Sequence, residues 1–89
     1  MQSEAKASFA VIRYNLRTYE SGGVMAVIKG RENAESALKQ FEKTQTSEDR
    51  HNGWRYFLEK TDLRAGMDPT EATNLRQSRL ENRESQAQN

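Results

Sequence analysis

Two runs of alternating β-branched and aromatic residues, joined by a pair of glycines, constrain this 89-residue chain more than any other feature. Residues 9–19 and 24–29 each show the two-residue periodicity of a strand, and their residue types favour strands. Gly22 and Gly23 lie between the runs, and glycine readily adopts the positive φ angles of a tight reversal. The sequence therefore predicts an antiparallel hairpin.

A helix and a third strand follow the hairpin. Asn33 is a candidate N-cap, and apolar residues then recur at spacings of three and four up to about Thr44, which is typical of an amphipathic helix. Residues 45–53 are polar and end in an Asn-Gly dipeptide, which predicts a loop. Residues 54–60 alternate again and predict a third strand.

The start of a second helix is the clearest local signal in the chain. Asp68 is a suitable N-cap, Pro69 suits the first helical position, and Glu71 completes a capping-box pattern. We expect this helix to run to about residue 85. Its apolar positions are few, which predicts a helix that packs weakly, projects, or awaits a partner.

The predicted order is β-β-α-β-α. The fold class is α+β, a three-stranded, largely antiparallel sheet with one helix packed on a face and a long polar C-terminal helix. An antiparallel sheet requires the third strand to pair with the first, which we favour. The predicted organisation is a disordered leader (1–8), a core domain (9–67), the C-terminal helix (68–85) and a disordered tail (86–89).

The alternation divides the strand residues between two faces. We expect the more apolar face to pack under the first helix. It comprises Ile12, Tyr14, Leu16, Ala26, Ile28, Trp54, Tyr56 and Leu58. The other face is too apolar to be simply solvated, and its members are candidate partner-binding residues. These are Phe9, Val11, Arg13, Arg17, Met25, Val27, Lys29, Arg55 and Phe57.

Several interpretations compete for that second face. The C-terminal helix could fold over it, with Leu75 and Leu80 covering Val27 and Phe57. The face or the helix could instead mediate self-association, since small domains often complete a core by dimerising. A third interpretation uses its basic residues as phosphate contacts around stacking aromatics, as in single-stranded nucleic-acid binders.

Three arginines of the C-terminal helix are further candidate partner-binding residues. Arg76, Arg79 and Arg83 recur at spacings of three and four. They could meet phosphates or an acidic partner. Glutamates share the same helix, however, and mixed charges on a polar helix usually serve solubility.

Composition argues against catalysis and against several classes of site. The chain has no cysteine, which excludes disulfides and thiolate chemistry, and its single histidine, His51, lies in a polar segment without a recognisable nucleophile or metal-ligand spacing. We expect no enzymatic activity, no cofactor, no metal and no membrane partner. A cytoplasmic location is expected because no signal-like apolar run is found.

The sequence thus favours a small non-catalytic protein-interaction or regulatory domain. We expect it to self-associate through the outer sheet face or the C-terminal helix. The alternative is a module that binds single-stranded RNA or DNA through the basic and aromatic residues of that face.

Overall fold

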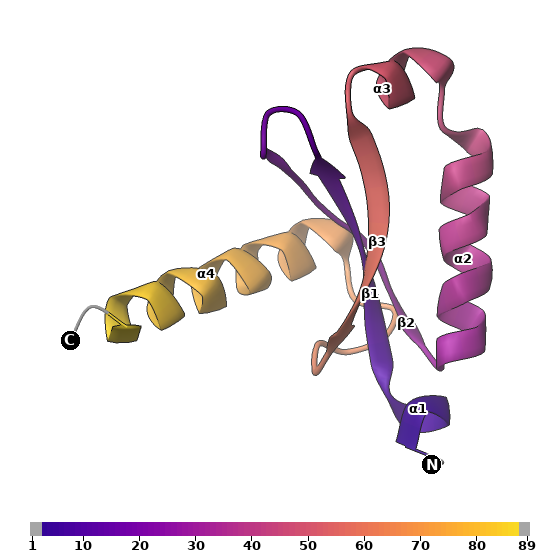
Figure 1. Cartoon of the computed structure of the whole chain (residues 1–89). Coiled ribbons are helices and arrows are strands. Elements are labelled where there is room, and N and C mark those ends of the chain that lie inside the picture. Colours follow the sequence, from indigo (N-terminus) through magenta and orange to yellow (C-terminus); the bar gives the residue numbers. More distant parts are fainter. Residues whose placement is uncertain (1–2, 88–89) are drawn as a thin grey trace.

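The computed structural model describes residues 3–87 and forms an α+β arrangement around one sheet (Figure 1). No described helix has the length and apolar character needed to cross a bilayer. The elements are α1 (Ser3–Lys6), β1 (Ser8–Asn15), β2 (Ser21–Lys29), α2 (Arg31–Thr44), α3 (Ser47–His51), β3 (Trp54–Thr61) and α4 (Pro69–Ala87).

The three strands form an open antiparallel sheet in the order β2-β1-β3. The hairpin and the order β-β-α-β-α are confirmed, and so is the pairing of the third strand with the first. The reversal lies at residues 16–20 and not at Gly22 and Gly23, which belong to β2. β1 is central because α2 returns the chain to the far side of β1 and not to the free side of β2.

A bulge in β2 changes which residues share a face. Val11 pairs with Ala26 and Ile12 with Val24, so Met25 is an extra residue on the β2 side. One extra residue reverses the inward and outward alternation beyond it. Val24 and Val27 consequently lie on the same face, each only 3% exposed.

The predicted division between the two faces is wrong for β1. Residues directly opposite each other in neighbouring strands share a face. Val11 lies opposite Leu58, and Arg13 lies opposite Tyr56, so this half of β1 belongs to the face of the β3 aromatics. Ile12 lies opposite Phe57 on the other face. The physical reason is that β1 carries apolar residues on both faces, and both faces are covered.

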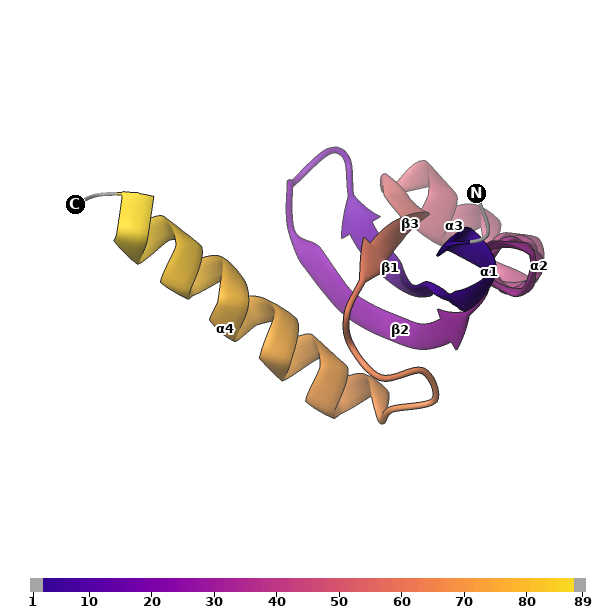
Figure 2. The same cartoon turned by 90° about the horizontal axis from the view of Figure 1, so that it is seen from below.

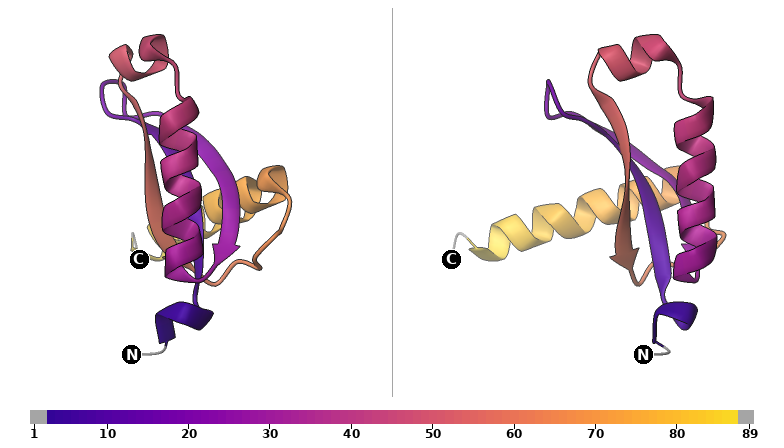
Figure 3. Two further views of the ribbon diagram at one scale, coloured as in Figure 1. Left: turned by 90° about the vertical axis from the view of Figure 1, so that its right-hand side faces the viewer. Right: turned by 45° about the vertical axis from the view of Figure 1, so that its right-hand side comes forward.

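The first face packs against α2 (Figure 3). Ala34 is fully buried, and the rings of Phe41 and Tyr56 lie 5.3 Å apart between centroids. The helix begins earlier than predicted, because Gly30 with φ of 90° is its N-cap. The side chain of Asn33 instead donates a hydrogen bond from Nδ2 to the carbonyl of Lys29.

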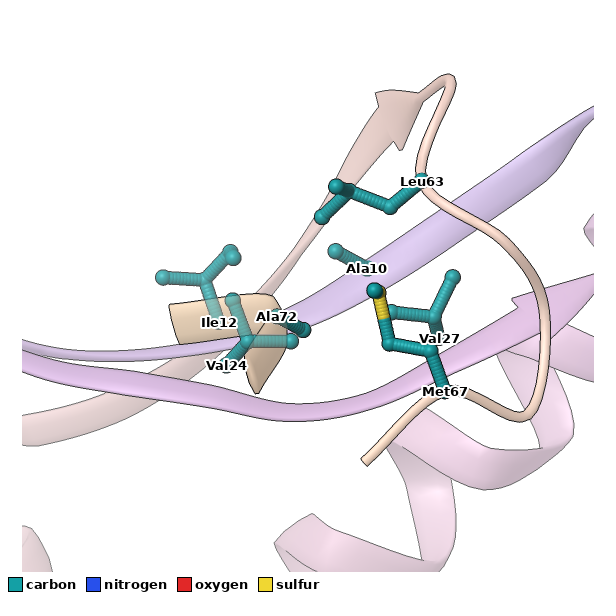
Figure 4. Close-up of a cluster of buried hydrophobic side chains, with 7 residues drawn as sticks. All are labelled: Ala10, Ile12, Val24, Val27, Leu63, Met67 and Ala72. Carbon is teal, nitrogen blue, oxygen red and sulfur yellow. The ribbon is translucent and has the colours of Figure 1, made fainter. Parts of the chain in front are cut away.

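The second face is covered at one end by the connection after β3 and by the first turns of α4. These elements enclose a buried apolar cluster (Figure 4). Its members are Ala10, Ile12, Val24, Val27, Leu63, Met67 and Ala72. The core therefore lies on both sides of the sheet, and the second side depends on α4 only at its base.

α4 begins where the sequence predicts. The Asp68 carboxylate accepts hydrogen bonds from the amides of Thr70 (3.0 Å) and Glu71 (3.2 Å), and Pro69 is the first helical residue. Beyond its first turns the helix leaves the sheet and projects away from the body, as Figures 1 and 2 show. It extends to Ala87, and residues 88–89 of the predicted tail lie outside the described part.

Three local predictions differ from the structure. The first strand ends at Asn15 and not at Tyr19, because the Asn15 side-chain oxygen accepts from the amides of Arg17 and Thr18 and turns the chain. The predicted loop at 45–53 contains α3, capped by the Thr46 hydroxyl, which accepts from the amide of Asp49. Residues 1–8, expected to form a disordered leader, include α1 and the start of β1.

Candidate interaction surface

The structure does not bring the candidate partner-binding residues together on one exposed face. Phe9 and Val11 lie under α2, 2% and 0% exposed, and Val27 lies in the cluster beneath α4, 3% exposed. These three apolar residues are core residues. Met25 is half-buried at the bulge, and Lys29 is exposed at the end of β2.

Arg13 lies on the α2 side, where it covers an aromatic ring. Its guanidinium carbon lies 3.8 Å from the centroid of the Trp54 ring, a cation–π geometry. Its Nη2 lies 3.6 Å from the Asp49 carboxylate of α3. Arg13 thus connects the sheet to α3.

Arg17 and Arg55 donate to backbone carbonyls. Arg17 Nη1 donates to the carbonyl of His51 at 3.1 Å, and Arg55 Nη1 donates to the carbonyls of Arg50 (2.8 Å) and Trp54 (2.7 Å). Both side chains therefore hold the short helix α3 and its flanking turns against the strands.

The arginines of α4 pair with carboxylates at the end of β3. Arg76 donates from Nε and Nη2 to the two carboxylate oxygens of Glu59, each at 2.9 Å, and this hydrogen bonding raises the pKa of Arg76. Arg79 pairs with Asp62. Together with Leu63 and Leu80, these residues line a shallow hollow between β3 and α4. The side chain of Arg83 lies outside the described residues.

Apolar groups stay exposed on the side of the sheet from which α4 projects. Phe57 is 43% exposed and Leu75 is 39% exposed, and Tyr14 is half-buried on the same side of the sheet as Ile12. We call Tyr14, Phe57 and Leu75 the α4-side surface. The sequence singled out Phe57 as a candidate but assigned Tyr14 to the core and Leu75 to a covering role.

The hairpin turn also departs from prediction. Leu16, assigned to the core face, is 50% exposed, and Tyr19 is 75% exposed with a φ of 64°. Both follow Asn15, whose side chain ends the strand before either residue can join the alternating pattern.

Within the described residues, no group of three or more His, Cys, Asp or Glu side chains is placed to hold a metal ion. His51 is exposed at the end of α3, and its backbone carbonyl accepts a hydrogen bond from Arg17 Nη1. The expectations of no metal, no cofactor and no enzymatic activity stay predictions.

Comparisons with protein-family models, with curated proteins and with solved structures find no match to this chain. The α4-side surface must therefore be interpreted from its own chemistry.

Proposed function

We propose that this chain is a small interaction domain that associates with a second copy of itself through the α4 side of its sheet. One observation carries the proposal: the phenyl ring of Phe57, on β3, is 43% exposed on the face that holds the buried apolar cluster beneath α4. An aromatic ring in such a position adds substantial contact area when a partner covers it.

The geometry of α4 supports the same conclusion. Only the base of the helix is buried, through Ala72, while Leu75 is 39% exposed and the helix continues away from the body (Figure 2). Two anchors fix its direction. Thr73 bonds to Val24 of β2, and Arg76 bonds to Glu59 of β3. A helix held this way forms a stable wall beside the exposed sheet residues, and small domains often complete a partly covered core by dimerising.

The nucleic-acid alternative gains no support from the geometry. It requires exposed aromatics next to available basic groups, but Phe9 is buried and Arg13 lies over Trp54 beside Asp49. Arg76 is paired with Glu59. The cytoplasmic location inferred from the sequence stays a prediction.

The test is the solution mass of the nuclease-treated chain by light scattering, at low and moderate salt. We expect a dimer at both salt concentrations, because the contact at Phe57 is apolar and involves no release of counterions. Replacing Phe57 by Ser should shift the equilibrium toward monomer. The matched control is Leu16→Ser, which removes a comparably exposed apolar group from the hairpin turn and should leave the dimer intact. A monomer at all accessible concentrations would contradict the proposal.

A further inference from the structure

We infer how the two copies pair, an inference that rests on the proposed self-association. β3 of one copy pairs antiparallel with β3 of the second copy about a two-fold axis at Phe57. The two three-stranded sheets then become one continuous sheet of six strands. Four observations lead to this arrangement: the position of β3, the direction of its backbone groups, its charge pattern and the exposure of Phe57.

β3 is an edge strand that is free to accept a neighbour. The order β2-β1-β3 leaves one of its sides without a strand among the described residues, and Figure 3 (left) shows it at the margin of the sheet. The opposite edge, β2, is less suitable. It contains the bulge at Met25 and the positive φ angle of Gly23, and such irregularities prevent regular pairing.

The backbone of β3 presents alternate residues to the free side. The amide of Leu16 donates to the carbonyl of Gly53 at 2.8 Å, so odd-numbered residues of this strand bond to β1. The backbone N–H and C=O groups of the even-numbered residues point away from β1, toward the free edge. The Trp54 carbonyl agrees with this assignment, since it accepts from the side chains of Gln45 and Arg55 and not from β1. The backbone groups at the centre of the strand, those of Tyr56 and Leu58, are the ones that a second β3 would meet.

The charge pattern of β3 selects one register. With the axis at Phe57, the two Phe57 rings lie opposite each other on the α4 side. Arg55 of each copy then lies opposite Glu59 of the other copy, which gives two pairs of opposite charge. Tyr56 lies opposite Leu58 on the α2 side. Because Phe57 bonds to β1, the central pair is of the non-hydrogen-bonded kind, in which side chains approach most closely.

Neighbouring registers lose these pairs. If the axis lies midway between two residues, odd-numbered residues of one β3 lie opposite even-numbered residues of the other. The α4 side of one sheet then continues into the α2 side of the other, which sets buried positions against exposed ones. Moving the axis by one whole residue places the ring of Phe57 opposite the charge of either Arg55 or Glu59. Charged residues usually protect an edge strand from pairing, and here they favour pairing in one register.

Both charged groups can serve the interface while keeping their contacts within the chain. The Glu59 side chain is 44% exposed although it binds Arg76, and a carboxylate accepts several hydrogen bonds. The two carbonyls that Arg55 binds accept from one terminal nitrogen, Nη1, and a guanidinium has further donors. α4 of each copy lies on the same side of the joined sheet, beside the two Phe57 rings.

The experiment is a charge exchange between two variants of the full chain. In a dimer of the Arg55→Glu variant, two negative charges lie opposite each other at both places where positions 55 and 59 meet. In a dimer of the Glu59→Arg variant, two positive charges meet at each of these places. We expect each variant alone to dimerise about tenfold or more weakly than the unmodified chain. An equimolar mixture restores both opposite-charge pairs, and we expect a heterodimer of nearly normal affinity by sedimentation equilibrium and native mass spectrometry.

Two controls separate the interface from the fold. Lys29→Glu reverses a charge on the opposite edge strand, β2, without altering β3, and it should leave dimerisation unchanged. Thermal unfolding of each variant followed by circular dichroism reports whether it folds. The chain has no cysteine, so a single introduced thiol can report the pairing. Phe57→Cys weakens the dimer as Phe57→Ser does, but at high concentration under oxidising conditions a disulfide across the two-fold axis should trap the pairs that form, whereas Lys29→Cys on the other edge should give no cross-link under the same conditions.

The outcomes distinguish this inference from the proposed function. If the unmodified chain is monomeric, both fail. If it is a dimer that Phe57→Ser disrupts, but the mixture of charge variants shows no recovery and Phe57→Cys forms no cross-link, the edge pairing is overturned while self-association stands. Recovery in the mixture together with the Phe57→Cys cross-link supports the proposed register.

Discussion

The Arg76 guanidinium holds the Glu59 carboxylate through two hydrogen bonds of 2.9 Å each, which join α4 to the edge strand β3. The Arg76 side chain is 23% exposed and that of Glu59 is 44% exposed, so solvent screens the pair. Its role is to set the direction of α4 more than to stabilise the fold.

Replacing Arg76 by Ala should accordingly lower the free energy of unfolding by about 1 kcal/mol or less in urea titrations. Hydrogen exchange in the first half of α4 should increase. The matched control is Arg79→Ala, whose partner Asp62 is 81% exposed and whose loss should cost less. A larger effect at Arg79 would contradict this ranking.

The same pair leads to a prediction about pH. Hydrogen bonding to Glu59 raises the pKa of Arg76. A group whose pKa is raised on folding stabilises the fold at pH values below its pKa in the unfolded chain. It loses that contribution only as the pH rises through its pKa in the folded chain. The pKa of Arg76 lies far into the alkaline range in both the folded and the unfolded chain. The stability difference between the unmodified chain and Arg76→Ala should therefore be constant from about pH 7 to about pH 10. A decline over that interval would show that another group controls the pair.

Thr73 satisfies a backbone amide at the bulge in β2. Its hydroxyl accepts from the amide of Val24 at 2.9 Å and donates to the carbonyl of Pro69 at 2.8 Å. Thr73→Val keeps the shape but leaves the Val24 amide without this acceptor, at an expected cost of about 1 to 3 kcal/mol in urea unfolding. Thr73→Ser keeps the hydroxyl and should cost less. Equal losses would mean that the methyl group matters and the hydrogen bond does not.

Gly53 and Gly66 form a matched pair for testing close packing. Both have positive φ, 102° and 82°, so alanine is strained at either position. A Cβ at Gly53 would lie 2.7 Å from both Asn15 Oδ1 and Arg17 Cγ, whereas nothing lies within 4 Å at Gly66. Gly66→Ala should cost about 1 kcal/mol. Gly53→Ala should cost clearly more, because it also disturbs Asn15, and equal melting temperatures for the two variants would rule out the clash.

Trp54 and Phe9 test the revised assignment of the faces. Phe9 is 2% exposed under α2, so Phe9→Ala should cost about 3 to 5 kcal/mol. Trp54 is only half-buried, with Arg13 over its ring, so Trp54→Ala should cost less, about 2 kcal/mol. Urea unfolding of both variants measures the order. If Phe9→Ala were the milder change, Phe9 would be the outer residue that the sequence suggested.

The candidate surface was predictable in part. Phe57 was singled out because its strand alternates, and the structure leaves it exposed on the side of α4. Phe9 was grouped with it and proves to be buried, because the pairing places Phe9 opposite Ile28 on the face that α2 covers. The partners of the arginines were not predictable at all. Arg76 and Glu59 are seventeen positions apart, and no local pattern relates them.

The sequence by itself determined the local elements: a hairpin of two strands, although not the place of its turn, then the third strand, the start of α4 at Asp68 and Pro69, and hence the β-β-α-β-α order. These depend on periodicity, turn residues and capping, which act over a few residues. Only the tertiary structure decided which side of β1 faces α2. Both faces of β1 are apolar, and the bulge at Met25 reverses the alternation in β2. The choice between faces therefore comes from packing between distant segments, as does the pairing of each arginine.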